Sequence, residues 1–238
     1  MPESPRVVFL PGFMQHADSW SEVATAVGER YPSSVVEFET WTFEERLQEI
    51  EAAGEGAVLV GYSMGGRLAL NAAVRNPGRY PGLVLVGSTP GIEDADDHAR
   101  RRVSDDELAA WMESHAIDDI VARWERNPVF ATQPGWLLAE QRRWRLRNSP
   151  RDLAGLLRSA GQGAVPALWG RLGELSMPVL ALAGAHDTDY VGIGERVAEL
   201  VPLGRFELVA DAGHAAHLEQ PAAVRDAILA FIERLTDL

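Results

Sequence analysis

The sequence contains neither cysteine nor lysine. The absence of cysteine excludes disulfide bonds, thiolate metal sites and a cysteine nucleophile. The absence of lysine excludes Schiff-base chemistry through a lysine amine. All 22 basic residues are therefore arginine. Any anion site has to be built from guanidinium groups, which suit a bidentate grip on carboxylates, although codon bias alone would equally explain the missing lysine.

Long apolar runs and an excess of positive charge are also missing. No apolar stretch approaches the ~20 residues that span a bilayer, and Met1–Arg6 lacks the basic and then apolar pattern of a signal peptide. The net charge of −13 argues against nucleic acid or an acidic membrane as a partner, because phosphate binding needs a basic face. We therefore expect a cytoplasmic protein without a membrane span; its oligomeric state is not indicated.

Short apolar runs alternate with helical patterns in the first and last parts of the chain. The runs that predict strands are 6–10, 34–38, 57–60, 83–86, 178–184 and 205–209. The patterns that predict helices are at about 18–30, 42–52, 67–76, 193–200 and 221–235. Continuous apolar strands separated by helices are typical of a mostly parallel sheet flanked by helices on both faces.

The stretch from Glu93 to about Gly173 contains helical patterns only. They cover 104–114, 117–126, 134–147 and 150–159, and Ser104 with Glu107 forms a capping box at the first of them. We therefore predict an α/β fold with an inserted all-helical lid. The expected division is 1–91 for the first part of the core, 92–173 for the lid and 174–238 for the second part of the core. A chain of 238 residues is long enough for one sizeable core and an inserted subdomain.

One short turn, Gly61-Tyr62-Ser63-Met64-Gly65, combines a buried strand before it with a helix after it. In that context G-x-S-x-G predicts a nucleophile elbow, in which the serine occupies strained backbone on a tight strand-to-helix turn. Gly61 and Gly65 supply the small neighbours that such a turn needs. Ser63 is therefore the candidate reactive residue.

A serine hydroxyl becomes reactive when an imidazole takes its proton and a carboxylate orients that imidazole. On this type of fold the chain order is serine, aspartate, histidine. Asp187 follows the strand at 178–184, and His214 lies in the loop after the strand at 205–209. The pattern leaves Asp189 open as a rival acid, and His186 or His217 as rival bases.

An oxyanion hole beside Ser63 is expected from two backbone N–H groups. One belongs to Met64, the residue after the serine, and the other to Phe13, after the first strand. Pro11-Gly12 would make the tight turn that brings Phe13 near, although an ordinary strand-ending turn would have the same residues.

Several segments make the chain resemble the α/β-hydrolase superfamily and, within it, the 2-succinyl-6-hydroxy-2,4-cyclohexadiene-1-carboxylate synthase family of menaquinone biosynthesis. The matching positions are Tyr62 and Arg67 around the elbow, Arg101 ahead of Asp105 and Leu108-Ala109, Trp124 and Phe130 around Pro128, and Arg145 ahead of Asn148, Leu153-Ala154 and Gly161-Gln162-Gly163. The resemblance runs from Phe9 to Pro221, and its helical part is the discriminating one.

The resemblance implies a lyase that eliminates pyruvate from 2-succinyl-5-enolpyruvyl-6-hydroxy-3-cyclohexene-1-carboxylate, a small polycarboxylate, without cofactor or metal. Ser63 would be a general base assisted by His214 and Asp187, and the oxyanion hole would hold an enolate. The substrate-binding residues that it implies are Tyr62, Arg67, Arg101, Trp124, Phe130 and Arg145. Arg100 and Arg102 are rivals of Arg101, and the arginines from 142 to 151 could equally form a solvated helix face.

Three departures from the family pattern concern the pocket. Pro11 stands where relatives have histidine, Phe38-Glu39-Thr40-Trp41-Thr42 replaces an Asp-x-Pro-Gly-His-Gly type of loop, and Asp189-Tyr190 replaces Lys-Phe. The alternative functions are a serine hydrolase of small esters or carbon–carbon bonds on the same fold, and a catalytically silent binder. A triple arginine pocket favours the lyase over the hydrolase, and an intact triad disfavours the binder.

Overall fold

The computed structural model describes residues 4–236, so Met1–Glu3, part of the segment considered above for a signal peptide, lie outside the described residues. Six parallel strands form one sheet in the order β2-β1-β3-β4-β5-β6. The strands are β1 Arg6–Leu10, β2 Ser33–Val35, β3 Ala57–Tyr62, β4 Leu83–Val86, β5 Val179–Gly184 and β6 Gly204–Val209. The predicted parallel sheet is confirmed.

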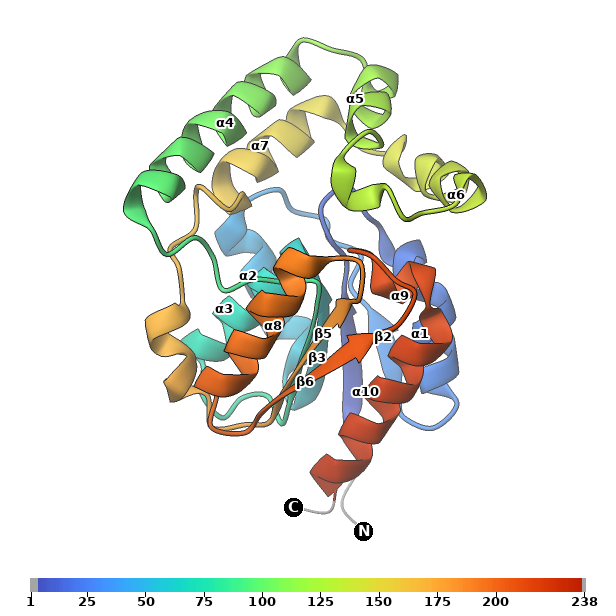
Figure 1. Cartoon of the computed structure of the whole chain (residues 1–238), viewed down its shortest axis with the longest axis vertical. Coiled ribbons are helices and arrows are strands. Elements are labelled where there is room, and N and C mark those ends of the chain that lie inside the picture. The colour runs from blue at the N-terminus through green and yellow to red at the C-terminus, as the bar shows by residue number, and fades with distance from the viewer. Residues whose placement is uncertain (1–3, 237–238) are drawn as a thin grey trace.

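Helices cover both faces of the sheet, because successive side chains of a buried strand point to opposite sides. In β1, Val7 and Phe9 pack with residues of α1 (Ser21–Gly28) and α10 (Pro221–Thr236). Val8 and Leu10 join the opposite core with residues of α2 (Phe43–Gly54), α3 (Met64–Arg75) and α8 (Thr188–Leu200). Figure 1 shows these helices on the two sides of the strands.

The strand order reverses between β1 and β3. From β1 the chain moves outward to β2 and then returns to place β3 on the other side of β1, with Leu10 paired to Gly61. Open α/β sheets bind ligands outside the carboxyl ends of the strands at such a reversal. The loop after β1 and the turn at Ser63 therefore lie side by side where a ligand site is expected.

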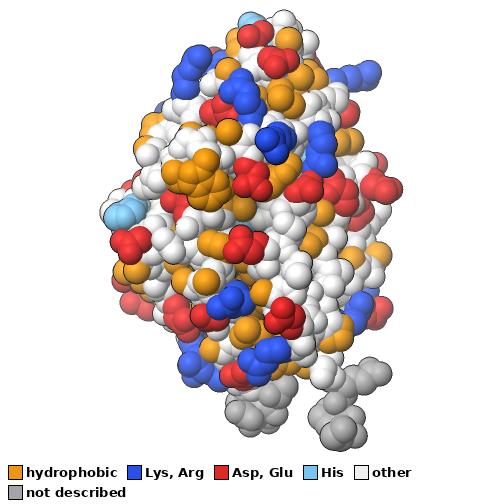
Figure 2. Space-filling model, turned by 90° about the vertical axis from the view of Figure 1, so that its right-hand side faces the viewer, with side chains coloured by type: hydrophobic (Ala, Val, Ile, Leu, Met, Phe, Trp, Pro, Cys, Tyr) orange, Lys and Arg blue, Asp and Glu red, His pale blue; other side chains and the backbone are white. Residues whose placement is uncertain are grey.

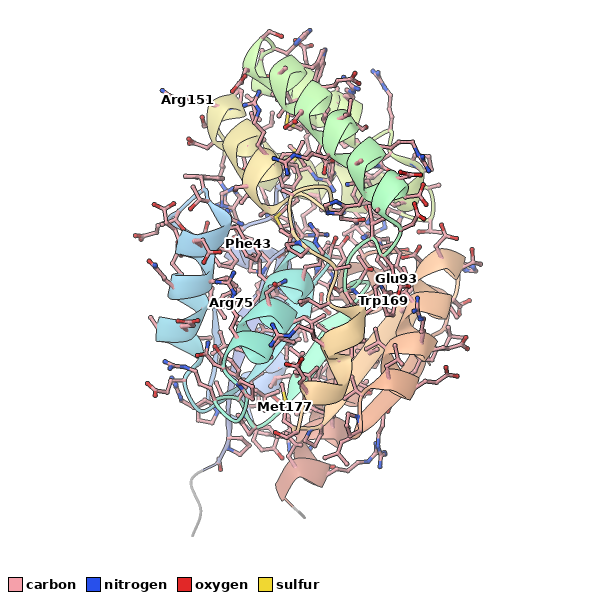
Figure 3. All side chains as sticks on the ribbon, turned by 90° about the vertical axis from the view of Figure 1, so that its left-hand side faces the viewer. Phe43, Arg75, Glu93, Arg151, Trp169 and Met177 are labelled. Atoms are coloured by element: carbon pink, nitrogen blue, oxygen red, sulfur yellow. The ribbon has the colours of Figure 1, made fainter. Side chains whose placement is uncertain are left out.

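Between β4 and β5 the chain forms what we call the helical segment (residues 92–173). Its helices are α4 Ala95–Glu113, α5 Ile117–Trp124, η2 Pro128–Phe130, α6 Gly135–Arg145, α7 Pro150–Ala160 and the start of η3 Trp169–Glu174. Figure 1 shows α4 to α7 stacked over one end of the sheet. Glu93 and Trp169, which lie near each other in Figure 3, are joined through α8: Arg196 Nη2 donates to Glu93 and its guanidinium lies 4.1 Å from the Trp169 ring.

Two helix starts differ from the prediction. The α4 helix begins at Ala95, where Asp94 accepts a hydrogen bond from Asp97 N (2.8 Å), so the Ser104–Glu107 capping box is wrong and these residues continue a helix already under way. The α8 helix begins at Thr188 instead of 193, with Asp187 at its N-cap position.

The second strand is also shorter than predicted. It ends at Val35 instead of Phe38. The Glu37 carboxylate leaves the sheet edge to accept from the Ala17 N–H and to pair with His16. Phe38 then packs beneath the guanidinium of Arg46, 4.4 Å from the ring centre. Local side-chain partners therefore end the strand before its apolar pattern does.

Acidic and basic side chains are interspersed over the face that Figure 2 shows. Most of the arginines pair with a carboxylate, as Arg75 does with Glu44 and Arg158 with Glu113. Within residues 4–236, none of the helices has the length and apolar character that crossing a membrane would require.

Candidate active site

The turn after β3 has the geometry of a nucleophile elbow. Ser63 has φ 49° and ψ −111°, and residues other than glycine rarely adopt a positive φ of this kind. A Cβ on Gly61 would lie 2.6 Å from the backbone of Gly65, and one on Gly65 would lie 2.3 Å from Leu10 O. Only glycine fits these two positions, so the sequence fixes the strained turn from both sides.

Ser63, His214 and Asp187 form a connected hydrogen-bonded set. His214 Nε2 lies 3.3 Å from Ser63 Oγ, and His214 Nδ1 lies 2.7 Å from Asp187 Oδ2. The histidine side chain is 7% exposed and the aspartate side chain 12%, so their pairing is shielded from water. The α8 N-terminus delivers Asp187, and the loop after β6 delivers His214.

The rival residues do not join this set. Asp189 and His186 are exposed to solvent. His217 is buried between the rings of Trp20 and Tyr62, with both centroids 4.3 Å away. Neither ring nitrogen of His217 has a hydrogen-bond partner among residues 4–236. Burial lowers the pKa of His217 to about 3, so this imidazole stays neutral.

The buried His217 predicts a pH dependence of stability. Its pKa is about 3 in the folded chain and near 6.5 in the unfolded one, so below pH 6.5 only the unfolded state binds the proton. Stability is therefore lost as pH falls from 6.5 toward 3. The free energy of unfolding, measured with urea, should fall between pH 7.5 and pH 5 by about 2 kcal/mol less in His217→Phe than in the wild type. An equal fall in the free energy of unfolding in both proteins would contradict the low pKa of the buried His217.

Two backbone N–H groups belong to residues that line the same cavity as Ser63. Those of Phe13 and Met64 have no hydrogen-bond partner in the described part of the chain, residues 4–236. A Cβ on Gly65 would lie 2.5 Å from Pro11 O, so the loop after β1 lies close against the elbow. Gln15 Oε1 accepts from the Gly12 N–H (3.1 Å) within that loop. Two free donors beside a serine are the components of an oxyanion hole.

A cavity of about 170 Å³ opens over Ser63 between the sheet and the helical segment. Every site residue predicted from the sequence lines it except Asp187, which contacts His214 from outside the cavity: the lining includes Phe13, Tyr62, Ser63, Met64, Arg67, Arg101, Trp124, Phe130, Arg145 and His214. Residues from the first strand loop, the elbow, the helical segment and the last loop therefore meet in one place.

Arginine supplies the positive charge of the cavity. Arg145 is 2% exposed, and its Nη2 donates to Gln141 Oε1 (2.7 Å) while its Nη1 lies 3.7 Å from Glu125 Oε1. Arg67 Nη2 donates to Ala160 O (3.1 Å), and Arg101 Nε pairs with Asp105 (2.7 Å). Burial lowers the pKa of Arg67 to about 10, which leaves it charged at neutral pH.

Aromatic rings form the apolar walls. The Phe13 ring lies 5.2 Å from that of Trp124, which lies 6.2 Å from Phe130. Phe130 in turn lies 4.9 Å from the guanidinium carbon of Arg145. The core loop and the helical segment therefore touch through aromatic contacts at the cavity wall.

Sequence reasoning missed part of the cavity lining. The missed residues are Gln15, Asn127, Val129, Leu157, Gly161, Gln162 and Tyr190. Asn127 and Val129 lie between the two matched aromatics, and Gln162 lies inside the matched Gly-x-Gly, so proximity to matched motifs was a usable signal. Residues 38–42, the loop that differs from the family pattern, pack with Arg46 and do not line this cavity. Pro11 does not line it either.

No cluster of three or more His, Cys, Asp or Glu side chains able to hold a metal ion occurs within residues 4–236.

The comparisons with known proteins agree with this fold. Residues 7–227 match the model of the alpha/beta hydrolase family. The 2-succinyl-6-hydroxy-2,4-cyclohexadiene-1-carboxylate synthase of Citrobacter koseri is 31% identical over 248 residues, covering 95% of this chain and 93% of that one. The chain belongs to this synthase family of α/β-hydrolases. The predicted α/β-hydrolase fold and the family resemblance are both confirmed.

Two further relatives are similar to this chain. A Bacillus subtilis protein named for the same synthase is 39% identical over 168 residues, which are 68% of this chain and 61% of the relative's length. MenH from S. aureus superposes with a TM-score of 0.92 at 29% identity, over 99% of this chain and 96% of that one. A thermophilic esterase from Thermogutta terrifontis, at 21% identity and a TM-score of 0.79, shares the fold.

Proposed function

We propose that this protein eliminates pyruvate from 2-succinyl-5-enolpyruvyl-6-hydroxy-3-cyclohexene-1-carboxylate to give 2-succinyl-6-hydroxy-2,4-cyclohexadiene-1-carboxylate. One observation carries the proposal: Arg67, Arg101 and Arg145 line the same cavity as the Ser63 hydroxyl. Guanidinium groups match the carboxylates of such a substrate. The synthase names of the relatives support this choice of reaction.

Elimination begins with removal of a proton from the ring carbon next to the succinyl carbonyl. Ser63 Oγ takes this proton as its own hydroxyl proton passes to His214 Nε2, and Asp187 stabilises the imidazolium that forms. The broken C–H bond supplies the electrons of an enolate. Its oxygen would accept hydrogen bonds from the Phe13 and Met64 N–H groups.

Collapse of the enolate completes the reaction. The electron pair moves through the ring to form the new carbon–carbon double bond, and the ring C–O bond to the enolpyruvyl group breaks. The leaving group departs as the enolate of pyruvate, which takes up a proton on carbon. The protonated His214 would donate this proton to the pyruvate enolate. The triad then returns to its starting state without a covalent intermediate.

The remaining residues would bind and enclose the substrate. The three arginines would hold its carboxylates, while Tyr62, Trp124 and Phe130 would pack against the ring. The helical segment would act as a lid, with residues 1–91 and 174–238 as the core beneath it. We place this chemistry in the cytoplasm, on a small-molecule substrate.

A serine hydrolase is the second candidate, because the same connected set of Ser63, His214 and Asp187 could form an acyl enzyme. A neutral ester gains nothing from three arginines. We therefore expect the purified protein to release pyruvate from the enolpyruvyl substrate, followed through lactate dehydrogenase, and to hydrolyse nitrophenyl esters slowly. Fast ester hydrolysis without pyruvate release would transfer the assignment to the hydrolase.

A further inference from the structure

A tyrosine that the mechanism above leaves unused lies in the same cavity. Tyr190 is the third residue of α8, and its ring packs against that of His214 with centroids 4.5 Å apart. Its hydroxyl accepts a hydrogen bond from Gln162 Nε2 (3.4 Å), and both residues line the cavity. The start of α8 therefore supplies two groups to the site, Asp187 bonded to His214 and Tyr190 packed on its ring.

Two guanidinium groups lie close enough to Tyr190 to influence its ionisation. They belong to Arg67 and Arg101. Arg67 uses one Nη2 bond to Ala160 O and Arg101 uses Nε toward Asp105. The other N–H groups of these two arginines have no hydrogen-bond partner within the described residues 4–236.

Arg145 lines the same cavity as Arg67 and Arg101. Its Nη2 donates to Gln141 Oε1 (2.7 Å). Three guanidinium groups therefore serve one cavity, and a ligand with several carboxylates can engage more than one of them.

The Tyr190 hydroxyl can only be a neutral donor to such a ligand. Burial raises the pKa of Tyr190 above its ordinary value, so the proton is retained at neutral pH. The Gln162 amide occupies one lone pair of the oxygen, which leaves the O–H free to point at an acceptor. A neutral donor in a cavity that also holds cations strengthens the grip on an anion without adding to the repulsion between the cations.

We propose that the Tyr190 hydroxyl, Arg67 and Arg101 form one carboxylate subsite of the cavity, with Gln162 orienting the hydroxyl. The identity of the substrate in this inference rests on the proposed function, whereas the chemistry of the subsite does not. Arg145, which lines the same cavity, is then available for another carboxylate.

Tyr190→Phe tests the subsite, because it deletes the hydroxyl and keeps the ring against His214. A hydrogen bond to a charged group predicts a rise in KM for the enolpyruvyl substrate of about tenfold, with the change in KM and not in kcat. Titration calorimetry with phthalate, an aromatic dicarboxylate that cannot react, should show a similar loss of affinity. Tyr31→Phe, which removes a hydroxyl on the other side of the sheet, is the control and should match the wild type.

Gln162→Met provides a second variant that keeps the size of the side chain. It should raise KM less than Tyr190→Phe does, and the double variant should lose no more than Tyr190→Phe alone, because the amide acts through the hydroxyl. The subsite is overturned if phthalate does not bind the wild type, or if Tyr190→Phe leaves both the phthalate affinity and KM at wild-type values. Absence of pyruvate release by the wild type would sink the proposed function, and the phthalate measurement would still decide the subsite.

Discussion

Ser63→Ala is expected to lower kcat for pyruvate release by about 10²- to 10⁴-fold, the range that a positioned general base contributes. The reason is that, among residues 4–236, no other oxygen is hydrogen-bonded to His214 Nε2. KM should change little, since the hydroxyl acts on the transition state and not on the carboxylates. Steady-state pyruvate release with the pure variant measures both constants.

The matched control is Ser114→Ala, which removes an exposed hydroxyl at the end of α4 and should leave kcat at the wild-type value. Asp187→Asn and His214→Ala should each remove most activity as well. Because the three residues act as a unit, combining any two should cost little more than the worse single change. A Ser63→Ala variant that folds and turns over within a few-fold of the wild type would remove the base assignment.

Arg145→Met is expected to lower kcat/KM by about 10- to 100-fold, because a charge-assisted hydrogen bond to a carboxylate contributes about 1.5–3 kcal/mol. Methionine keeps much of the volume of this buried side chain, so the loss should reflect the missing charge. The same change leaves Glu125 without one of its two arginine neighbours, and thermal unfolding should show a lower Tm.

Arg143→Met is the control on the same helix, because Arg143 is exposed and outside the cavity. It should leave both kcat/KM and Tm near the wild-type values. The carboxylate role of Arg145 fails if its variant loses Tm while kcat/KM stays unchanged, since Arg145 would then be a structural partner of Glu125.

The strained turn and its partners could be predicted because each depends on a local constraint that the sequence displays. Gly61 and Gly65 are required because a Cβ at either position would lie less than 3 Å from neighbouring backbone atoms, and a strand and a helix flank them. The order serine, aspartate, histidine then limits the partners to loops after later strands. The position of Asp187 nearer the strand end favoured it over Asp189, and the same order favoured His214 over His217. Only burial and hydrogen bonds separate these residues from their rivals in space.

Residues that depend on how the helical segment packs were harder to predict. Gln162 and Tyr190 are 28 positions apart in the sequence and form a hydrogen bond because the end of α7 lies near the start of α8. The sequence of neither helix predicts this contact. The start of α4 was missed for a related reason. Once Asp94 caps the helix, its propagation through Ser104 overrides a capping pattern that would suffice in isolation.

The central claim is that Ser63 removes a proton from carbon and never bonds to carbon itself. The direct measurement is a single-turnover comparison of the enolpyruvyl substrate with and without deuterium on the carbon next to its succinyl carbonyl, with intact-protein mass recorded as the reaction proceeds. The account predicts slower pyruvate release from the deuterated substrate and an unchanged protein mass. Equal rates together with a transient adduct on Ser63 would contradict it.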